Sequence, residues 1–213
     1  MFTTIKDRYK LHGADPFFRF STTVSIIALL LASVVNYYAG TYATEVASNY
    51  VTDVVLSNIR VFDVDLVFVY GSGLVTVFLG VLLLIHPKRI PFTLHSLTLF
   101  VLIRSVFISL THIAPYPSQA VLDLGSVANK FIFGGDLFFS GHTGIPFLLA
   151  LIFWKEVRLR YLFIGCSIVF GTTALMGHLH YTIDVLSAFF ITYTIFVIAE
   201  KLFRRERELF NQD

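Results

Sequence analysis

Charge is scarce in this sequence. Of its 213 residues, 14% are charged and 56% are hydrophobic, and the mean hydropathy is +0.76. Soluble domains carry about 25% charged residues, so this composition excludes an ordinary soluble domain and indicates a membrane protein. The formal net charge of +2 is too small to suggest a nucleic-acid partner. The chain has one cysteine, Cys166, which excludes an intrachain disulfide.

Long apolar runs are present instead, each bounded by charge, proline or glycine. They predict an all-α, polytopic membrane protein with six transmembrane helices, because a spanning helix takes about 20 mainly apolar residues. The approximate limits are residues 20–42, 65–85, 92–112, 137–154, 161–177 and 181–201. Since these helices use most of the chain, we interpret residues 1–213 as a single membrane domain, with no room for an additional soluble domain.

The basic residues indicate how the helices are oriented. All of the 16 lysines and arginines except Arg60, Arg104 and Lys130 fall in the two tails or in the second and fourth loops. By the positive-inside rule, both termini are predicted to be cytoplasmic. The loops predicted to face the exoplasmic side, whether lumenal, periplasmic or extracellular, are residues 43–64, 113–136 and 178–180.

Four ionisable side chains interrupt the predicted helices: Arg104, His142, His180 and Asp184. Such a group costs about 2.5–3.5 kcal/mol at mid-membrane on insertion scales, so each one indicates function. The predicted orientation places all four in the outer half of the membrane, although they come from three separate helices. Two of these helices present their amino ends there, and Arg104 adds a planar cation suited to phosphate oxygens. The expected ligand is therefore a phosphate near the outer surface.

Two histidines and a carboxylate beside an anion pocket are suited to phosphoryl transfer. His180 and Asp184 are four residues apart, which places them on one face of a helix. A carboxylate that accepts a hydrogen bond from one ring nitrogen makes a histidine a better nucleophile or base. His142 can then protonate the leaving oxygen. A covalent phosphohistidine would split one difficult displacement into two easier ones.

Two longer motifs surround these residues. Residues 134–143 read G-G-D-L-F-F-S-G-H-T, and residues 178–188 read H-L-H-Y-T-I-D-V-L-S-A. They resemble the patterns C-G-D-x-x-x-S-G-H-T and H-Y-[ST]-x-D-V of the type 2 phosphatidate phosphatase superfamily, in the branch that contains the sphingomyelin synthases. A weaker similarity joins Arg104 and the P-Y-P run at residues 115–117 to the third helix of that branch.

The resemblance implies a role for each matching residue. The predicted catalytic residues are His142, His180 and Asp184, the predicted phosphate-binding residues are Arg104, Ser140 and Gly141, and Asp136 and Tyr181 are candidates for a supporting or head-group role. His180 resembles the nucleophile, Asp184 its orienting carboxylate, and His142 the acid that serves the leaving group and later activates the acceptor. This mechanism requires no metal ion and no other cofactor.

The implied activity is that of an integral-membrane lipid phosphotransferase or phosphohydrolase. The enzyme would cleave a phospholipid head-group phosphoester at the outer leaflet and pass the phospho group to water or to a lipid hydroxyl, such as that of ceramide or diacylglycerol. Thr173 and Ala174 stand where soluble-type phosphatases have an S-R pair, and no lysine precedes Arg104 as in the K-x6-R-P signature. Both departures favour the synthase-like branch over a generic phosphatidate phosphatase.

Four other interpretations stay open at this stage. The protein could be a lipid phosphate phosphatase of the same superfamily, or a transporter whose polar residues line a path. A metal site could use the histidines and aspartates of the two motifs, although their spacing fits no closed zinc pattern. Arg104 could also pair with Asp63 or Asp65 for stability alone. His178 is interpreted as a surface loop residue.

Overall fold

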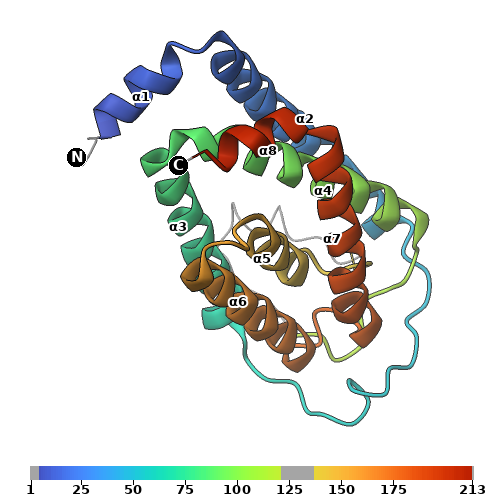
Figure 1. The fold of residues 1–213 in the computed structure, drawn as a ribbon. Helices are drawn as coiled ribbons and strands as arrows, with labels where there is room; N and C mark the ends of the chain where they lie inside the picture. The colour runs from blue at the N-terminus through green and yellow to red at the C-terminus, as the bar shows by residue number, and fades with distance from the viewer. Residues whose placement is uncertain (1–4, 121–136, 213) are drawn as a thin grey trace.

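The protein consists of helices and connecting loops over the residues that its computed structural model describes, 5–120 and 137–212 (Figure 1). In chain order the helices are α1 (Ile5–Gly13), α2 (Pro16–Glu45), the π-helix η1 (Leu66–Gly71), α3 (Ser72–Ile85), the 3-10 helix η2 (Pro87–Arg89), α4 (Ile90–Leu110), α5 (Gly141–Ile152), α6 (Val157–Met176), α7 (Thr182–Leu202) and α8 (Arg204–Phe210). No strand occurs within these described ranges, and the predicted all-α class is confirmed.

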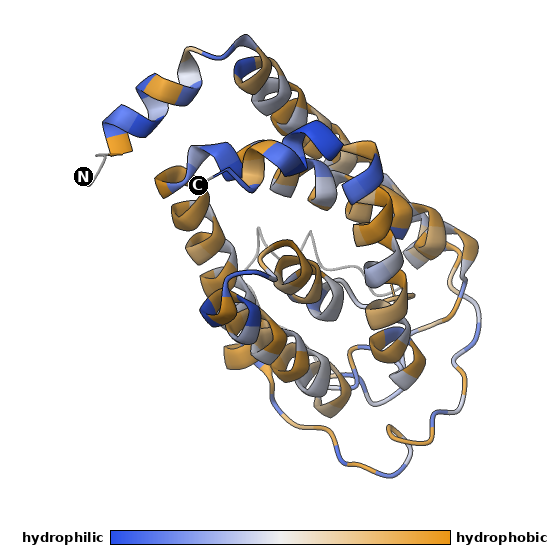
Figure 2. Cartoon of the chain, in the orientation of Figure 1, coloured by the Kyte–Doolittle hydropathy of each residue, from blue (hydrophilic) through white to orange (hydrophobic). Residues whose placement is uncertain are grey.

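Within residues 5–120 and 137–212, five helical segments are long and apolar enough to cross a membrane, namely α2, η1 with α3, η2 with α4, α6 and α7. Their ends fall within a few residues of the predicted limits, because long apolar runs bounded by charge or proline define them. Large apolar side chains such as Leu30, Leu74 and Leu110 are exposed on these helices. Figure 2 shows the hydrophobic colour along the long helices and the hydrophilic colour on α8 and at the start of α6. The chain is therefore a multi-pass membrane protein.

The fourth predicted span, residues 137–154, forms the shorter helix α5 of 12 residues. At about 1.5 Å per residue α5 is about 18 Å long, whereas the hydrocarbon core of a bilayer is about 30 Å thick. The helix lies in the centre of the bundle and contacts α4, α6 and α7 (Figure 1). Because most of its side chains are buried, the polar ends of α5 meet protein rather than lipid. A sixth complete crossing stays a prediction.

The carboxyl end of α5 is closed by a partly buried arginine from α8. Arg207 donates a hydrogen bond from Nη1 to the carbonyl of Ile152 at 2.8 Å, and its Nε pairs with Glu200 at 3.0 Å. Its guanidinium also lies over the Phe92 ring, 4.8 Å from the centroid. The carboxyl tail therefore forms a separate short helix that packs on the bundle. Its arginine supplies a hydrogen-bond donor to the Ile152 carbonyl, one of the last carbonyls of α5, which have no partner within that helix.

Both described chain ends lie at the same end of the bundle, since α1 and α8 each contact η2. Arg8 of α1 donates to the carbonyl of Ile85 at the end of α3 at 3.0 Å. The opposite end holds the loops of residues 46–65 and 111–120 together with the amino ends of α5 and α7. The side of the membrane that each end faces stays a prediction.

Candidate active site

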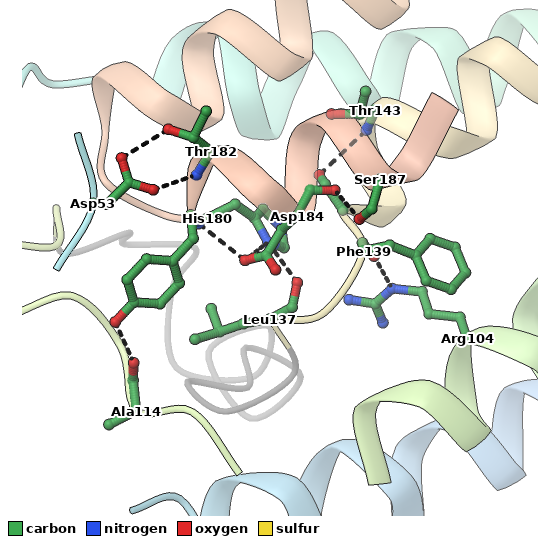
Figure 3. A network of polar contacts seen from close by, with 12 residues as sticks. Asp53, Arg104, Ala114, Leu137, Phe139, Thr143, His180, Thr182, Asp184 and Ser187 are labelled. Atoms are coloured by element: carbon green, nitrogen blue, oxygen red, sulfur yellow. Dashed lines mark hydrogen bonds and ion pairs between the residues drawn. The ribbon is translucent and has the colours of Figure 1, made fainter. Parts of the chain in front are cut away.

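The segment of residues 137–140, just before α5, contacts both α4 and residues 180–184 at the start of α7 (Figure 3). The carbonyl of Leu137 lies 3.0 Å from Nδ1 of His180, and the carbonyl of Phe139 accepts a hydrogen bond from Nε of Arg104 at 3.1 Å. The backbone N–H of Ser140 donates to the carbonyl of Asp184 at 3.0 Å. These three contacts bring Arg104, His180 and Asp184 to the amino end of α5, as the sequence analysis predicted for a shared site.

Ser140 is the N-cap residue of α5. Its Oγ accepts a hydrogen bond from the N–H of Thr143 at 3.4 Å, which satisfies one of the donors that the first helical turn leaves open. The next residue, Gly141, has no side chain, and a Cβ there would lie 3.3 Å from Nε of Arg104. Gly141 therefore lets the guanidinium approach the amino end of the helix closely.

Arg104 is a buried cation in α4, with only 8% of its surface exposed. Together with the positive end of the α5 dipole, it makes this part of the site favourable for an anion. The planar guanidinium suits phosphate oxygens, which it can bind through two donors at once. The geometry thus fits the predicted phosphate-binding role of Arg104, Ser140 and Gly141.

The protonation of His180 follows from its partner. A carbonyl oxygen can only accept a hydrogen bond, so Nδ1 of His180 carries the hydrogen that Leu137 accepts. In the neutral ring the lone pair then belongs to Nε2. The side chain is buried, and it is fixed in the tautomer that a nucleophilic Nε2 needs.

Asp184 lies near His180 without a hydrogen bond to it. Its Oδ2 is 3.7 Å from Nδ1 of His180, a distance that gives electrostatic attraction but exceeds hydrogen-bond length. The same Oδ2 accepts from the N–H of Tyr181 at 2.9 Å and caps α7, which begins at Thr182. His180 precedes the helix, so this cap, and not a shared helical face, brings the two side chains together.

His142 occupies the first turn of α5. Its ring packs against Phe68 with the centroids 4.0 Å apart, and it lies close enough to His180 and Arg104 to interact with both electrostatically. Phe68 is buried and belongs to the π-helix η1, a type of turn that often occurs at functional sites. Phe68 could not be identified from the sequence, since one phenylalanine among 23 gives no signal.

Asp53, in the predicted exoplasmic loop of residues 43–64, was not predicted as a site residue. Its Oδ2 accepts from the N–H of Thr182 at 2.7 Å, and its Oδ1 accepts from the Thr182 hydroxyl at 2.8 Å (Figure 3). Burial acts to raise the pKa of Asp53, but hydrogen bonds from Leu56, Thr182 and Val55 outweigh it and lower the pKa below its usual value of 3.8. Asp53 thus holds its loop, as a carboxylate, against the helix that follows His180.

Tyr181 connects two further loops to the same helix end. Its hydroxyl donates to the carbonyl of Ala114 at 2.8 Å and accepts from the N–H of Val51 at 3.3 Å. The ring is buried between these loops, and the supporting role of Tyr181 stays a prediction. Asp136, the other supporting candidate, lies outside the described residues.

The interpretation of His178 as a surface residue is wrong, because only 2% of its surface is exposed. Its Nδ1 lies 2.8 Å from the hydroxyl of Ser118, and its ring meets that of Tyr116 edge to face. Burial lowers the pKa of His178. His178 lies in the turn that follows α6, and its φ of 53° falls in the left-handed region. The sequence around it gives no sign of this conformation.

The site thus combines two histidines, a carboxylate and a buried arginine at a helix amino end. Among the described residues, no group of three histidine, cysteine, aspartate or glutamate side chains is placed to hold a metal ion. The arrangement is suited to binding a phosphate and to nucleophilic attack by a histidine.

Residues 134–201 match a family model described as PAP2 superfamily C-terminal. The match supports the type 2 phosphatidate phosphatase superfamily. It contains Ser140, His142, His180 and Asp184, whereas Arg104 precedes it. Members of the superfamily are phosphatases and phosphotransferases, which supports an enzyme that acts on lipid phosphates. Comparison with curated proteins gave no match, and neither did comparison with solved structures.

Proposed function

We propose that the protein is an integral-membrane enzyme that cleaves a phospholipid head-group phosphoester through a phosphohistidine on His180. The observation that supports this most strongly is the hydrogen bond from Nδ1 of His180 to the carbonyl of Leu137 at 3.0 Å, which assigns the lone pair to Nε2. The buried, positively charged Arg104 lies beside the amino end of α5, and together they would bind the phosphate next to that nucleophile.

In the first step, Nε2 of His180 attacks phosphorus, and the bond from phosphorus to the leaving oxygen breaks. His142 in its protonated form gives its proton to that oxygen, so the leaving group departs as a neutral alcohol. The new phosphorus–nitrogen bond leaves a positive charge on the His180 ring, which the Asp184 carboxylate at 3.7 Å stabilises.

In the second step, His142 is neutral and takes a proton from the acceptor hydroxyl. The acceptor oxygen attacks phosphorus, the phosphorus–nitrogen bond breaks, and its electron pair returns to Nε2 of His180. Throughout both steps, Arg104 and the N–H groups at Ser140 and Gly141 hold the phosphate oxygens. His142 ends protonated, and His180 ends in its starting tautomer.

We further propose that the acceptor is a lipid hydroxyl, as in the sphingomyelin synthase-like branch, with ceramide or diacylglycerol as candidates. The motifs around His142 and His180 support this branch, as does the lack of the S-R pair at Thr173 and Ala174. Water is the alternative acceptor, and with the same substrate it would make the protein a hydrolase of the phospholipase C type. If the substrate is instead a lipid phosphate without a head group, transfer to water would make the protein a lipid phosphate phosphatase. In the proposed orientation, six membrane helices place the site at the exoplasmic surface with both termini in the cytoplasm.

One assay separates these activities. The purified protein is incubated with phospholipids labelled in the head group, with and without ceramide or diacylglycerol, and both products are identified by mass. A new phospholipid made only with the acceptor supports transfer, whereas a free head-group phosphate made in either case supports hydrolysis.

The same assay tests the catalytic histidine with a matched pair of variants. His180→Ala is expected to lose activity by about 10⁴-fold or more, as when other nucleophile and base sets are removed. His112→Ala changes an exposed histidine outside the site and should keep wild-type activity. Full activity in His180→Ala would refute the proposed mechanism.

A further inference from the structure

The short segment between α6 and α7 carries His180 and is tied to two loops of the chain. On one side, the N–H of Phe62 donates to the carbonyl of Met176 at 2.9 Å. On the other side, the N–H of Ala120 donates to the carbonyl of Gly177, also at 2.9 Å. The position of His180 therefore depends on the direction in which this segment leaves α6.

The turn that ends α6 is a Schellman motif with a histidine in its left-handed position. The N–H of His178 donates to the carbonyl of Leu175 at 3.0 Å, and the N–H of Leu179 donates to the carbonyl of Ala174 at 2.8 Å. Leu179 and Ala174 also pack in one buried cluster, which is the apolar contact that often accompanies this motif. The residue just after the helix adopts a left-handed conformation in such a motif, and His178 does so with a φ of 53°.

Glycine is the usual residue at this position, because it adopts the left-handed conformation without a steric penalty. A histidine there is strained by its Cβ, whereas its backbone hydrogen bonds are ones that glycine could make equally well. Non-glycine residues held in this region cluster at functional sites, where surrounding contacts maintain them. The side chain of His178 therefore has a role that glycine could not fill.

That side chain links the turn to the loop that follows α4. Its Nδ1 lies 2.8 Å from the hydroxyl of Ser118, and its ring meets that of Tyr116 edge to face with the centroids 5.3 Å apart. Tyr116 also packs edge to face on Tyr181, the residue after His180, with the centroids 6.0 Å apart. One loop thus holds the chain both before and after His180, and His178 supplies the contact before it.

We propose that His178 is a positioning residue for His180, and that its contacts with Ser118 and Tyr116 fix the direction of the chain after α6. His180 follows two residues later, and its Nδ1 must reach the carbonyl of Leu137 to leave Nε2 as the nucleophile. Attack requires the reacting atoms to lie about 3–3.5 Å apart, so a small displacement of His180 lowers the rate more than the affinity for substrate. The proposal rests on the reaction proposed above and deepens it.

Three substitutions separate the conformation of the turn from the side chain. His178→Gly relieves the strain and removes the ring, whereas His178→Ala removes the ring and keeps the strain. His178→Asn tolerates the left-handed conformation and places an amide, which can donate or accept, near the Ser118 hydroxyl. Thermal unfolding and steady-state kinetics with the labelled phospholipids compare the three variants.

The glycine and alanine variants should each lose about 10- to 100-fold in kcat, with KM changed far less. The glycine variant should nevertheless have the higher melting temperature of the two. The asparagine variant should keep most of the wild-type kcat. A kcat that follows the melting temperature, with His178→Gly as active as wild type, would make His178 only a helix cap and would overturn the proposal.

Ser118→Ala tests the same link without changing the turn. It should lower kcat in the wild-type background and have no further effect in the His178→Gly background, because the link is then already lost. An equal loss in both backgrounds would overturn the proposal. The matched control is Ser33→Ala, which removes a hydroxyl that donates to the carbonyl of Leu29 within α2 and should leave kcat unchanged.

Formation of the phospho-adduct distinguishes failure of this proposal from failure of the proposed function. The adduct on His180 should form in the wild-type protein and should form about 10- to 100-fold more slowly in His178→Gly. Equal rates of formation in the two proteins would overturn the positioning role alone. Turnover by the wild-type protein without any adduct would refute the proposed function and this proposal with it.

Discussion

At the scale of single residues, a backbone carbonyl determines the tautomer of the His180 ring. The carboxylate expected to orient the ring, Asp184, instead caps α7 and stays 3.7 Å from Nδ1. Its role in the proposed reaction is therefore electrostatic, since its negative charge stabilises the positive charge that develops on the His180 ring. The Leu137 carbonyl keeps Nδ1 protonated whether or not that charge is present.

This division of roles predicts the behaviour of Asp184→Asn. An amide oxygen can still accept from the N–H of Tyr181, so α7 should keep its cap and the protein should fold. The negative charge is lost, and kcat is expected to fall about 10²- to 10⁴-fold, with KM changed far less. Thermal unfolding and steady-state kinetics of the purified variant measure the two effects. Unchanged kcat would exclude an electrostatic role for Asp184.

Asp53 predicts a dependence of stability on pH. Because its pKa is lowered in the folded protein, its contribution is fully present above the unfolded value, which is near 3.8, and is lost as pH falls through the lower folded pKa. Asp53→Asn keeps part of the contact with Thr182 but removes this titration. The difference in melting temperature between wild type and Asp53→Asn should therefore shrink as pH falls from about 6 to about 3. A difference that stays constant over this range would contradict the assignment.

The sequence predicted the side chains of the site better than their contacts. Arg104, His142 and His180 were identifiable because ionisable groups in apolar helices are rare. The carbonyl of Leu137 could not be identified, since every residue has one and only the fold aims it at His180. The link from Asp53 to Thr182 spans 129 positions of the chain and leaves no local pattern.

At the scale of secondary structure, the site depends on how closely α5 approaches its neighbours. Gly144 faces α4 and α7, where a Cβ would lie 2.7 Å from the Phe100 ring and 2.8 Å from the Thr192 hydroxyl. On the side of α6, the hydroxyl of Ser167 donates to the carbonyl of Thr143 at 2.7 Å. These contacts fix the helix whose first turn contains His142.

Gly144→Ala is therefore expected to destabilise the protein by about 1–3 kcal/mol, since overpacking forces helices apart. Gly165→Ala is the matched control in α6, because a Cβ there meets nothing within 4 Å. Thermal unfolding of both variants in the same detergent gives the comparison. Equal melting temperatures for the two variants would show that α5 is not tightly packed at Gly144.

The helix limits were predictable because apolar runs end at charge or proline, but the length of α5 was not. Apolar residues continue on both sides of the helix, at positions 137–139 and 153–154. The segment before it is instead held by the contacts of Leu137, Phe139 and Ser140 within the site. A buried central helix can be shorter than the membrane, since its neighbours shield both of its ends.

At the scale of the whole molecule, the basic residues predict the orientation. The end that holds α1 and α8 should face the cytoplasm, and the loop of residues 46–65 should face the opposite side. Asn58→Cys and Gln212→Cys, each in a Cys166→Ser background, place one exposed thiol at either end. In sealed cells or vesicles with the exoplasmic face outward, an impermeant thiol reagent should label position 58 and spare position 212 until the membrane is opened. The reverse pattern would invert the proposed topology.

The central claim is that His180 forms a covalent bond to the phosphorus of a lipid substrate. The most direct measurement is to quench the protein during turnover of phospholipids labelled in the head-group phosphate, without an acceptor lipid, and to locate the label by peptide fragmentation. We expect an acid-labile phospho-adduct on His180 of the wild-type protein. The adduct should be absent in His180→Ala, and it should be consumed when the acceptor lipid is added. Turnover without any adduct, or an adduct on His142 instead, would contradict the central claim.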